Sequence, residues 1–454
     1  MLTSINPANN KPILTYDETS SEESLKIISI ADDAFTIWKE TSFAHRSELM
    51  KNAARVLREN SEEYSVLMTM EMGKPILQSR AEVEKCAWVC DYYAENAEMF
   101  LEDEIIKTEA TKSFVSYQPI GVILAIMPWN FPFWQVFRFA APNLMTGNAG
   151  LLKHASNVSG CALAIEDIFR KAGFPENLFR TLLVKSKNSK KIISNEKIRA
   201  VTLTGSVPAG KSVASLAGSL IKKTVLELGG SDPYVILEDA DLEKAAMSCV
   251  TSRLINAGQS CIAAKRFIIV ESVYDKFEKL YLDLMAKKKM GDPFDEKNDL
   301  GPQASLQLRD ELHDQVLRSA KQGAELILGG TIPDMGGAYY PPTILRNVKP
   351  GMAAFDEELF GPVAALIKAN DEEDAIELAN KSIFGLGAAV FTKDIERGER
   401  IAKEKLNAGC CFVNDFVKSD PRLPFGGIKE SGYGRELSLF GIKEFVNIKS
   451  VYIK

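Results

Sequence analysis

The chain has 454 residues, of which 46% are hydrophobic and 26% charged, and its formal net charge is −6. This length exceeds what one hydrophobic core usually serves, so we expect a globular protein of two or more domains. The negative net charge gives no electrostatic reason for binding nucleic acid or an anionic membrane surface, and we expect neither as a partner.

The first residues lack a basic segment followed by an apolar run, and no apolar run reaches the roughly 18 residues of a spanning helix. We therefore predict neither a signal peptide nor a transmembrane segment. Seven cysteines are scattered along the chain without a CxxC pair, which predicts no disulfide framework and no metal site. A reducing cytoplasm is the expected location.

Apolar residues recur at helical spacing over 22–60 and 61–100, which predicts helices there. The apolar run 121–127 predicts a strand buried on both faces. Strands and helices then alternate, with helices expected at 133–145, 161–173 and 207–218 and strands at 149–155, 177–184, 198–206 and 222–230.

The second half repeats this pattern. We expect helices at 241–258, 274–288 and 306–323 and strands at 266–270, 363–369, 388–392 and 410–414. Such alternation predicts two doubly wound α/β units, which bind ligands beyond the carboxyl ends of their strands. The alternating tail 445–454 predicts an edge strand.

Three residues are candidates for chemistry. Cys261 follows the stop of a predicted helix and could face a cleft, although a buried structural cysteine is the simpler reading. Glu227 closes an apolar strand, where a carboxylate can have a raised pKa and act as a base, or can be held by an ion pair. Asn130, between two prolines, could donate to an oxyanion or merely form a turn.

A glycine turn at Gly205 and Ser206 precedes a predicted helix and suggests a phosphate site, although an ordinary strand-to-helix turn fits equally. Together with the segments MPWNFP, LLKHA, LELGG, GQSC, EELFGPV and PFGG, in this order, the chain resembles the aldehyde dehydrogenase superfamily along its whole length.

The resemblance implies a fold of two doubly wound α/β domains and a small oligomerisation hairpin. Residues 1–100 and 119–229 would bind the dinucleotide, 230–432 would be catalytic, and 101–118 with 445–454 would join subunits of a homodimer or homotetramer. It also implies a thioester mechanism: Cys261 is the nucleophile, Asn130 and the Cys261 backbone amide form the oxyanion hole, and Glu227 activates the hydrolytic water.

The implied cofactor site is Met127, Pro128, Trp129, Lys153, Ala155, Ser156, Gly205, Ser206, Leu228, Gly229, Glu358 and Phe360. NAD-preferring members usually carry a glutamate three residues after the lysine. Serine at this position removes a charge that would repel a 2′-phosphate, so we expect NADP to be preferred, with NAD also used.

Arginine at position 138 matches members that oxidise succinate semialdehyde, where it binds the distal carboxylate. The alternative is that Arg138 has a structural role and is bonded to carbonyl groups or to a nearby carboxylate. Ser419, Trp134, Phe131 and Phe425 complete the expected substrate site. A second arginine of some relatives is Ile255 here, and Arg253 or Arg422 could substitute for it.

The expected reaction is therefore oxidation of succinate semialdehyde, a step of GABA degradation. Another carboxylated semialdehyde such as glutarate semialdehyde, or a general aliphatic aldehyde, stays open, because one methylene changes binding by only about 1–3 kcal/mol. A non-enzymatic binding protein on the same fold is a further alternative, disfavoured by the intact catalytic residues.

Overall fold

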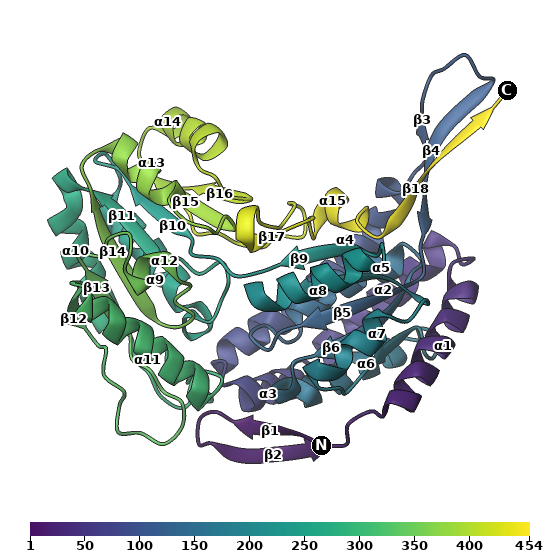
Figure 1. Ribbon diagram of the computed structural model, residues 1–454, viewed down its shortest axis with the longest axis horizontal. Helices are drawn as coiled ribbons and strands as arrows, with labels where there is room; N and C mark the ends of the chain where they lie inside the picture. Colours follow the sequence, from purple (N-terminus) through teal and green to yellow (C-terminus); the bar gives the residue numbers. More distant parts are fainter.

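The computed structural model describes residues 1–454 and arranges them as two sheet-based units and a projecting arm (Figure 1). The strands of the N-terminal sheet are β5 (Val122–Met127), β6 (Ala149–His154), β7 (Phe179–Thr181), β8 (Ile198–Thr204), β9 (Lys223–Glu227) and β17 (Gly432–Tyr433). They are ordered β17-β9-β8-β5-β6-β7, and all but β17 run parallel. The sheet is doubly wound, with its switch point between β5 and β8.

The second sheet is also doubly wound. Its strands are β10 (Pro233–Ile236), β11 (Arg266–Val270), β12 (Glu325–Leu328), β13 (Thr343–Arg346), β14 (Val363–Ala369), β15 (Gly387–Phe391) and β16 (Cys410–Val413). They are ordered β12-β13-β14-β11-β10-β15-β16, and only β12 is antiparallel. The predicted pair of doubly wound α/β units is therefore confirmed.

Helices flank both sheets (Figure 1). In the N-terminal unit they are α1 (Ser21–Trp38), α2 (Phe43–Glu59), α3 (Ser61–Met72), α4 (Ile76–Phe100), α5 (Trp134–Met145), α6 (Ser159–Lys171), α7 (Ser189–Ile193) and α8 (Val207–Ser219). In the remainder they are α9 (Leu242–Leu254), α10 (Glu271–Ala286), α11 (Leu306–Lys321), α12 (Ala353–Asp356), α13 (Glu372–Asn380), α14 (Ile395–Arg400) and α15 (Ser438–Ile442).

Two long predicted helices are each divided in two. Ser42 caps α2 by accepting a hydrogen bond from the His45 amide, which starts a new helix within 22–60. Gly73 ends α3 in the left-handed region at φ 77°, and Pro75 precedes α4, which divides 61–100. The N-terminal hairpin of β1 (Leu2–Asn6) and β2 (Lys11–Tyr16) was not predicted.

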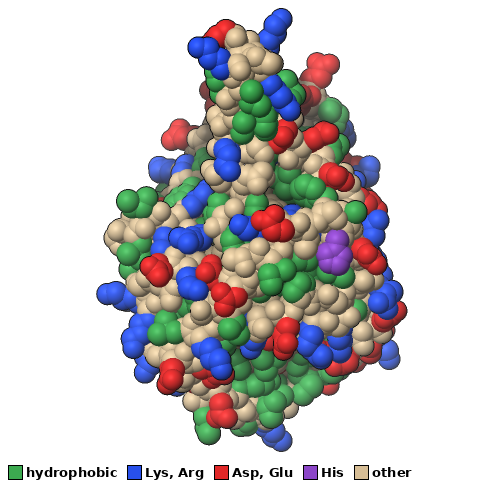
Figure 2. All heavy atoms as spheres, turned by 90° about the vertical axis from the view of Figure 1, so that its right-hand side faces the viewer, with side chains coloured by type: hydrophobic (Ala, Val, Ile, Leu, Met, Phe, Trp, Pro, Cys, Tyr) green, Lys and Arg blue, Asp and Glu red, His purple; other side chains and the backbone are tan.

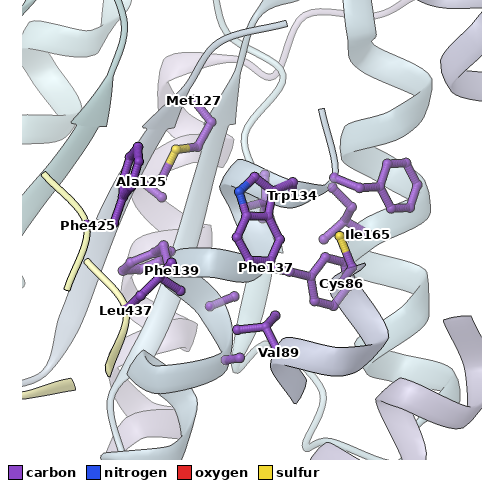
Figure 3. Close-up of a cluster of buried hydrophobic side chains, with 14 of the residues drawn as sticks. Cys86, Val89, Ala125, Met127, Trp134, Phe137, Phe139, Ile165, Phe425 and Leu437 are labelled. Atoms are coloured by element: carbon purple, nitrogen blue, oxygen red, sulfur yellow. The ribbon is translucent and has the colours of Figure 1, made fainter. Parts of the chain in front are cut away.

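Side chains of α4, α5 and β5 form one apolar cluster with the C-terminal segment (Figure 3). The cluster includes Cys86 of α4, Trp134 and Phe137 of α5, and Phe425 and Leu437 from beyond the second sheet. It fixes α4 and α5 against the strands whose ends carry the candidate residues.

The arm is a three-stranded antiparallel sheet of β3 (Glu104–Ile105), β4 (Lys112–Pro119) and β18 (Val446–Ile453). The predicted C-terminal edge strand is thus confirmed, and its partner is β4. Figure 2 shows the arm rising from the body, with apolar side chains on its surface; Ile105, Ile448 and Tyr452 are more than half exposed. None of the helices is both long and apolar enough to cross a bilayer.

Candidate active site

Two sets of loops meet at the site. Asn130, just after the carboxyl end of β5, donates a hydrogen bond to the Gln259 carbonyl oxygen before β11, at 3.1 Å. Glu358, before β14, accepts one from the Gly230 amide after β9, at 3.0 Å. The first sheet contributes its carboxyl ends, as predicted. The second sheet contributes its amino ends, which differs from our expectation.

A cavity of about 490 Å³ opens at this junction. Its walls come from α4, α5, α9 and the loops that carry Phe131, Cys261, Lys288 and Ser419, and Cys261 is the half-buried thiol on its lining. All five expected substrate residues line it: Phe131, Trp134, Arg138, Ser419 and Phe425. The structure therefore brings the predicted nucleophile and the predicted substrate side chains into one cavity.

The loop that carries Cys261 does not begin as predicted. Helix α9 ends at Leu254 rather than at Gly258, because Asn256 and Ala257 adopt left-handed backbone angles near φ 52°. Such angles are unfavourable for residues with a Cβ and persist only where the surroundings hold them. The Asn256 side-chain amide does so by donating to the Asn130 and Gln259 carbonyl oxygens, at 2.7 and 3.1 Å.

Buried cations hold the same loop from behind. Arg253 donates to the Gly258 carbonyl oxygen at 2.7 Å. Lys265 donates to the carbonyl oxygens of Ser260 and Cys261, at 2.9 and 2.6 Å. Burial raises the pKa of the Cys261 thiol to about 12, with Lys265 and Arg138 acting in the opposite direction. The thiol is therefore protonated at neutral pH and must lose its proton before it can attack.

The Asn130 side chain is fixed at both ends. Its Nδ2 donates to the Gln259 carbonyl oxygen, and its Oδ1 accepts from Gln135 Nε2 at 3.1 Å. An amide nitrogen carries two hydrogens, so one remains for an oxyanion. Asn130 does not itself line the cavity, but Gln135 does.

Glu227 ends β9 and is almost fully buried, with no hydrogen-bond partner for either carboxylate oxygen. Burial raises its pKa well above the usual range; Arg138 lowers the pKa, and Glu436 raises it. The alternative of a structural, ion-paired glutamate is not supported, because no cation lies within ion-pair distance of Glu227. A buried carboxyl with a raised pKa is suited to general base catalysis.

Arg138 is already paired. Its guanidinium forms an ion pair with Glu436, donates to Thr204 Oγ1 at 3.2 Å and lies 4.7 Å from the centroid of the Phe425 ring. This matches the structural alternative for this arginine. Direct contact between Arg138 and a substrate carboxylate stays a prediction, and Glu436 competes for the same guanidinium.

The two other candidate arginines do not line the cavity. Arg253 is fully buried beneath the Cys261 loop. Arg422 is exposed and pairs with Asp420 at 2.7 Å. Ile255 does line the cavity, so the position that carries a second arginine in some relatives presents an apolar side chain here.

The expected cofactor residues lie around the ends of β5, β6, β8 and β9. Lys153 is buried, donates to Ser186 Oγ at 3.3 Å and has no carboxylate within ion-pair distance. Ser206 precedes α8 without capping it, which leaves the amides of the first turn open. A buried unpaired ammonium and open amides fit the hydroxyls and phosphates of a dinucleotide. Ala155 donates its amide to the Met127 carbonyl oxygen at 2.9 Å, joining two of these loops.

The residues expected near the nicotinamide, Glu358 and Phe360, contact other expected cofactor residues. Glu358 packs against Gly229, where any side chain would collide with its carboxylate, and its Oε1 lies 3.4 Å from Lys265 Nζ. The Phe360 and Trp129 rings meet edge to face, with centroids 5.7 Å apart. One carboxylate oxygen of Glu358 is held by the Gly230 amide and Lys265, and the other lies against Gly229.

Sequence reasoning missed Lys85, Lys265 and Glu436. Lys85 Nζ donates to Ser419 Oγ at 2.9 Å, and Trp134 Nε1 donates to the same oxygen at 3.0 Å. In the sequence, only the position of Lys85 on the same helix as the buried Glu82 and Cys86 could have pointed to it. That position is weak evidence for a binding role.

A cavity thiol, a buried carboxyl with a raised pKa and open amides at the carboxyl ends of the first sheet are the arrangement expected of an enzyme that forms and hydrolyses an acyl thioester. The aldehyde dehydrogenase family profile matches residues 1–451, and the chain belongs to the aldehyde dehydrogenase family.

Among its relatives, a probable succinate-semialdehyde dehydrogenase [NADP(+)] from Synechocystis sp. is 49% identical and covers 100% of this chain and 99% of its own. The succinate semialdehyde dehydrogenase [NAD(P)+] Sad from Escherichia coli is 47% identical over 99% of this chain and 97% of its own. A crystal structure of succinic semialdehyde dehydrogenase from Streptococcus pyogenes with NADP+ is similar at a TM-score of 0.98, with 37% identity and full coverage of both chains.

Proposed function

We propose that this chain oxidises succinate semialdehyde to succinate, with NADP as the preferred cofactor and NAD as a second one. The observation that carries the proposal is the cavity lined by Cys261, Lys85 and Ser419, which joins a nucleophile to groups able to bind a carboxylate. Relatives that are 46–49% identical over the full length carry the name succinate-semialdehyde dehydrogenase.

In the first step the Cys261 thiol gives up its proton to water, its sulfur attacks the aldehyde carbon, and the carbonyl oxygen becomes an oxyanion. The free Nδ2 hydrogen of Asn130 and the Cys261 backbone amide stabilise this oxyanion. The bound dinucleotide would supply the oxidising chemistry by taking up hydride, which leaves a thioester on Cys261. Lys153, Ser206 and Glu358 would hold that dinucleotide.

In the second step water hydrolyses the thioester. Glu227 accepts the proton of that water, and the Cys261 sulfur leaves as the carboxylic acid forms. The absence of any cation paired to Glu227 keeps its basicity high once it is deprotonated. The product is a free acid.

The preference for NADP rests on Ser156, which begins the short helix after Lys153. A carboxylate here would repel a 2′-phosphate, whereas a hydroxyl can donate to it. The relatives named above carry NADP(+) or NAD(P)+ in their names.

The test is a panel of aldehydes with and without a terminal carboxylate, assayed at the absorbance band of the reduced nicotinamide with NADP and with NAD. Succinate semialdehyde should have the highest kcat/KM, and glutarate semialdehyde should follow. Equal kcat/KM for butanal would overturn the substrate assignment and leave a general aldehyde dehydrogenase.

We also propose the domain organisation expected from the sequence. Residues 1–100 and 119–229 bind the dinucleotide, and residues 230–432 form the catalytic domain, which carries the nucleophile. Segments 101–118 and 445–454 would join subunits of a homodimer or homotetramer. The exposed apolar side chains of the arm support this, and light scattering of the intact chain tests it. A cytoplasmic location stays a prediction.

A further inference from the structure

Six charged side chains line the cavity that contains Cys261, and five of them already have an opposite charge within 4 Å. The paired ones are Glu82 with Lys74, Arg138 with Glu436, Lys288 with Asp299 across the lining, and Lys418 with Asp415. Lys85 is the sixth, and no carboxylate of the protein lies within ion-pair distance of it.

Lys85 has polar and aromatic neighbours but no counter-ion. Its Nζ donates to Ser419 Oγ and lies 4.1 Å from the centroid of the Trp134 ring. The acid next to Ser419 in the chain, Asp420, is held by Arg422 instead. Burial and, after it, the charge of Arg138 lower the pKa of Lys85 to about 8. An ammonium kept in such a place without a partner is costly unless a ligand supplies the anion.

Hydrogen-bond donors converge beside this ammonium. Ser419 Oγ accepts from both Lys85 and Trp134 Nε1, so both of its lone pairs are used and its own hydrogen is free to donate. Lys85 keeps two further N–H groups after its bond to Ser419. A carboxylate that reaches this wall of the cavity would meet an ammonium and a hydroxyl donor together.

We propose that Lys85, together with Ser419, binds the carboxylate of the aldehyde substrate. The proposal rests on the function proposed above and deepens it. It places the contact on the one cation of the lining that has no carboxylate partner, whereas the charge of Arg138 is met by Glu436. Some relatives carry a second arginine at the position of Ile255. Here the cation that binds the substrate carboxylate is Lys85, which lies on α4 instead.

The kinetic test compares succinate semialdehyde with butanal, which has the same number of carbons and no carboxylate. Lys85→Met should raise KM for succinate semialdehyde by about 30-fold or more, the cost of losing a desolvated charge contact, and change kcat little. The kcat/KM for butanal should fall by far less. Lys85→Arg keeps the cation and should retain most of the preference, which shows that loss in Lys85→Met is not misfolding.

Lys418→Met is the matched control, because Lys418 lines the same cavity but is paired with Asp415. It should leave the preference for succinate semialdehyde intact. Binding is measured separately by titrating succinate and following the fluorescence of Trp134, which lies under the Lys85 ammonium. The wild type and Lys418→Met should respond, and Lys85→Met should not.

Two outcomes overturn the inference, and they are distinguishable. A wild type with no preference for succinate semialdehyde removes the proposed function as well. A wild-type preference that survives in Lys85→Met removes only the role of Lys85. If Arg138→Gln then abolishes the preference, the receptor is Arg138.

Discussion

Arg138 and Glu436 form a buried ion pair whose two charges act on Glu227 in opposite directions. The pKa of Glu227 is raised first by burial; Arg138 lowers it, and Glu436 raises it again. The pair therefore tunes the candidate base without a hydrogen bond to it.

This relationship predicts the effect of Glu436→Gln. Removing the negative charge of Glu436 lowers the pKa of Glu227, so Glu227 becomes the active base at lower pH. The acid limb of the kcat profile should then move to lower pH, as measured under steady state with succinate semialdehyde.

The variant leaves Arg138 buried without its counter-ion, which costs about 3–5 kcal/mol and should lower Tm. The thermal unfolding curve is therefore recorded beside the pH profile. An acid limb that stays in place in a folded variant would show that Glu436 does not act on the base.

Glu227→Gln should slow hydrolysis of the thioester more than its formation. Rapid mixing should show a burst of reduced cofactor close to one per active site, followed by a slow steady state. A steady-state rate equal to that of the wild type would mean that another group activates the water.

Ser156→Glu should shift the cofactor preference toward NAD, because a carboxylate would face the 2′-phosphate of NADP. KM for NADP should rise by an order of magnitude or more, because an unfavourable contact of about 1.4 kcal/mol or greater corresponds to at least a tenfold loss of affinity. Ser156→Ala is the matched control and should weaken NADP less. An unchanged kcat/KM for NADP would place the 2′-phosphate elsewhere.

Lys85 should give the substrate preference its own pH dependence. Its pKa is lowered to about 8 by burial and by Arg138, while Cys86, Glu82 and Asp420 raise it. Lys85 is charged below this pH, so the ratio of kcat/KM for succinate semialdehyde to that for butanal should fall as pH rises through about 8. Both substrates use the same thiol, so the ratio cancels the titration of Cys261. A ratio independent of pH would exclude Lys85 from the carboxylate contact.

Much of this architecture follows from local patterns. Alternating strands and helices predicted both doubly wound units, since each buried strand reads as an apolar run between helical segments. The break between α1 and α2 was missed because the helical spacing continues across Ser42, whose capping bond is a single side-chain contact.

The polar contacts inside the site depend on residues far apart in the chain. Lys85 meets Ser419 only because α4 packs beside the C-terminal segment, and Arg138 meets Glu436 in the same way. No local pattern encodes such pairs. The family resemblance therefore predicted Arg138 as the residue that binds the substrate carboxylate, and little in the sequence pointed to Lys85. The left-handed Asn256 and Ala257 were likewise invisible, because their conformation is held by contacts with the loop that carries Asn130.

The central claim is that the acyl group of the substrate is carried on Cys261. The direct measurement is mass spectrometry of Glu227→Gln quenched in acid during turnover of succinate semialdehyde with NADP, followed by peptide mapping. A succinyl group should appear on the peptide that contains Cys261, and it should be absent from Cys261→Ala treated in the same way. Turnover with no acyl group on Cys261, or substantial activity of Cys261→Ala, would contradict the account.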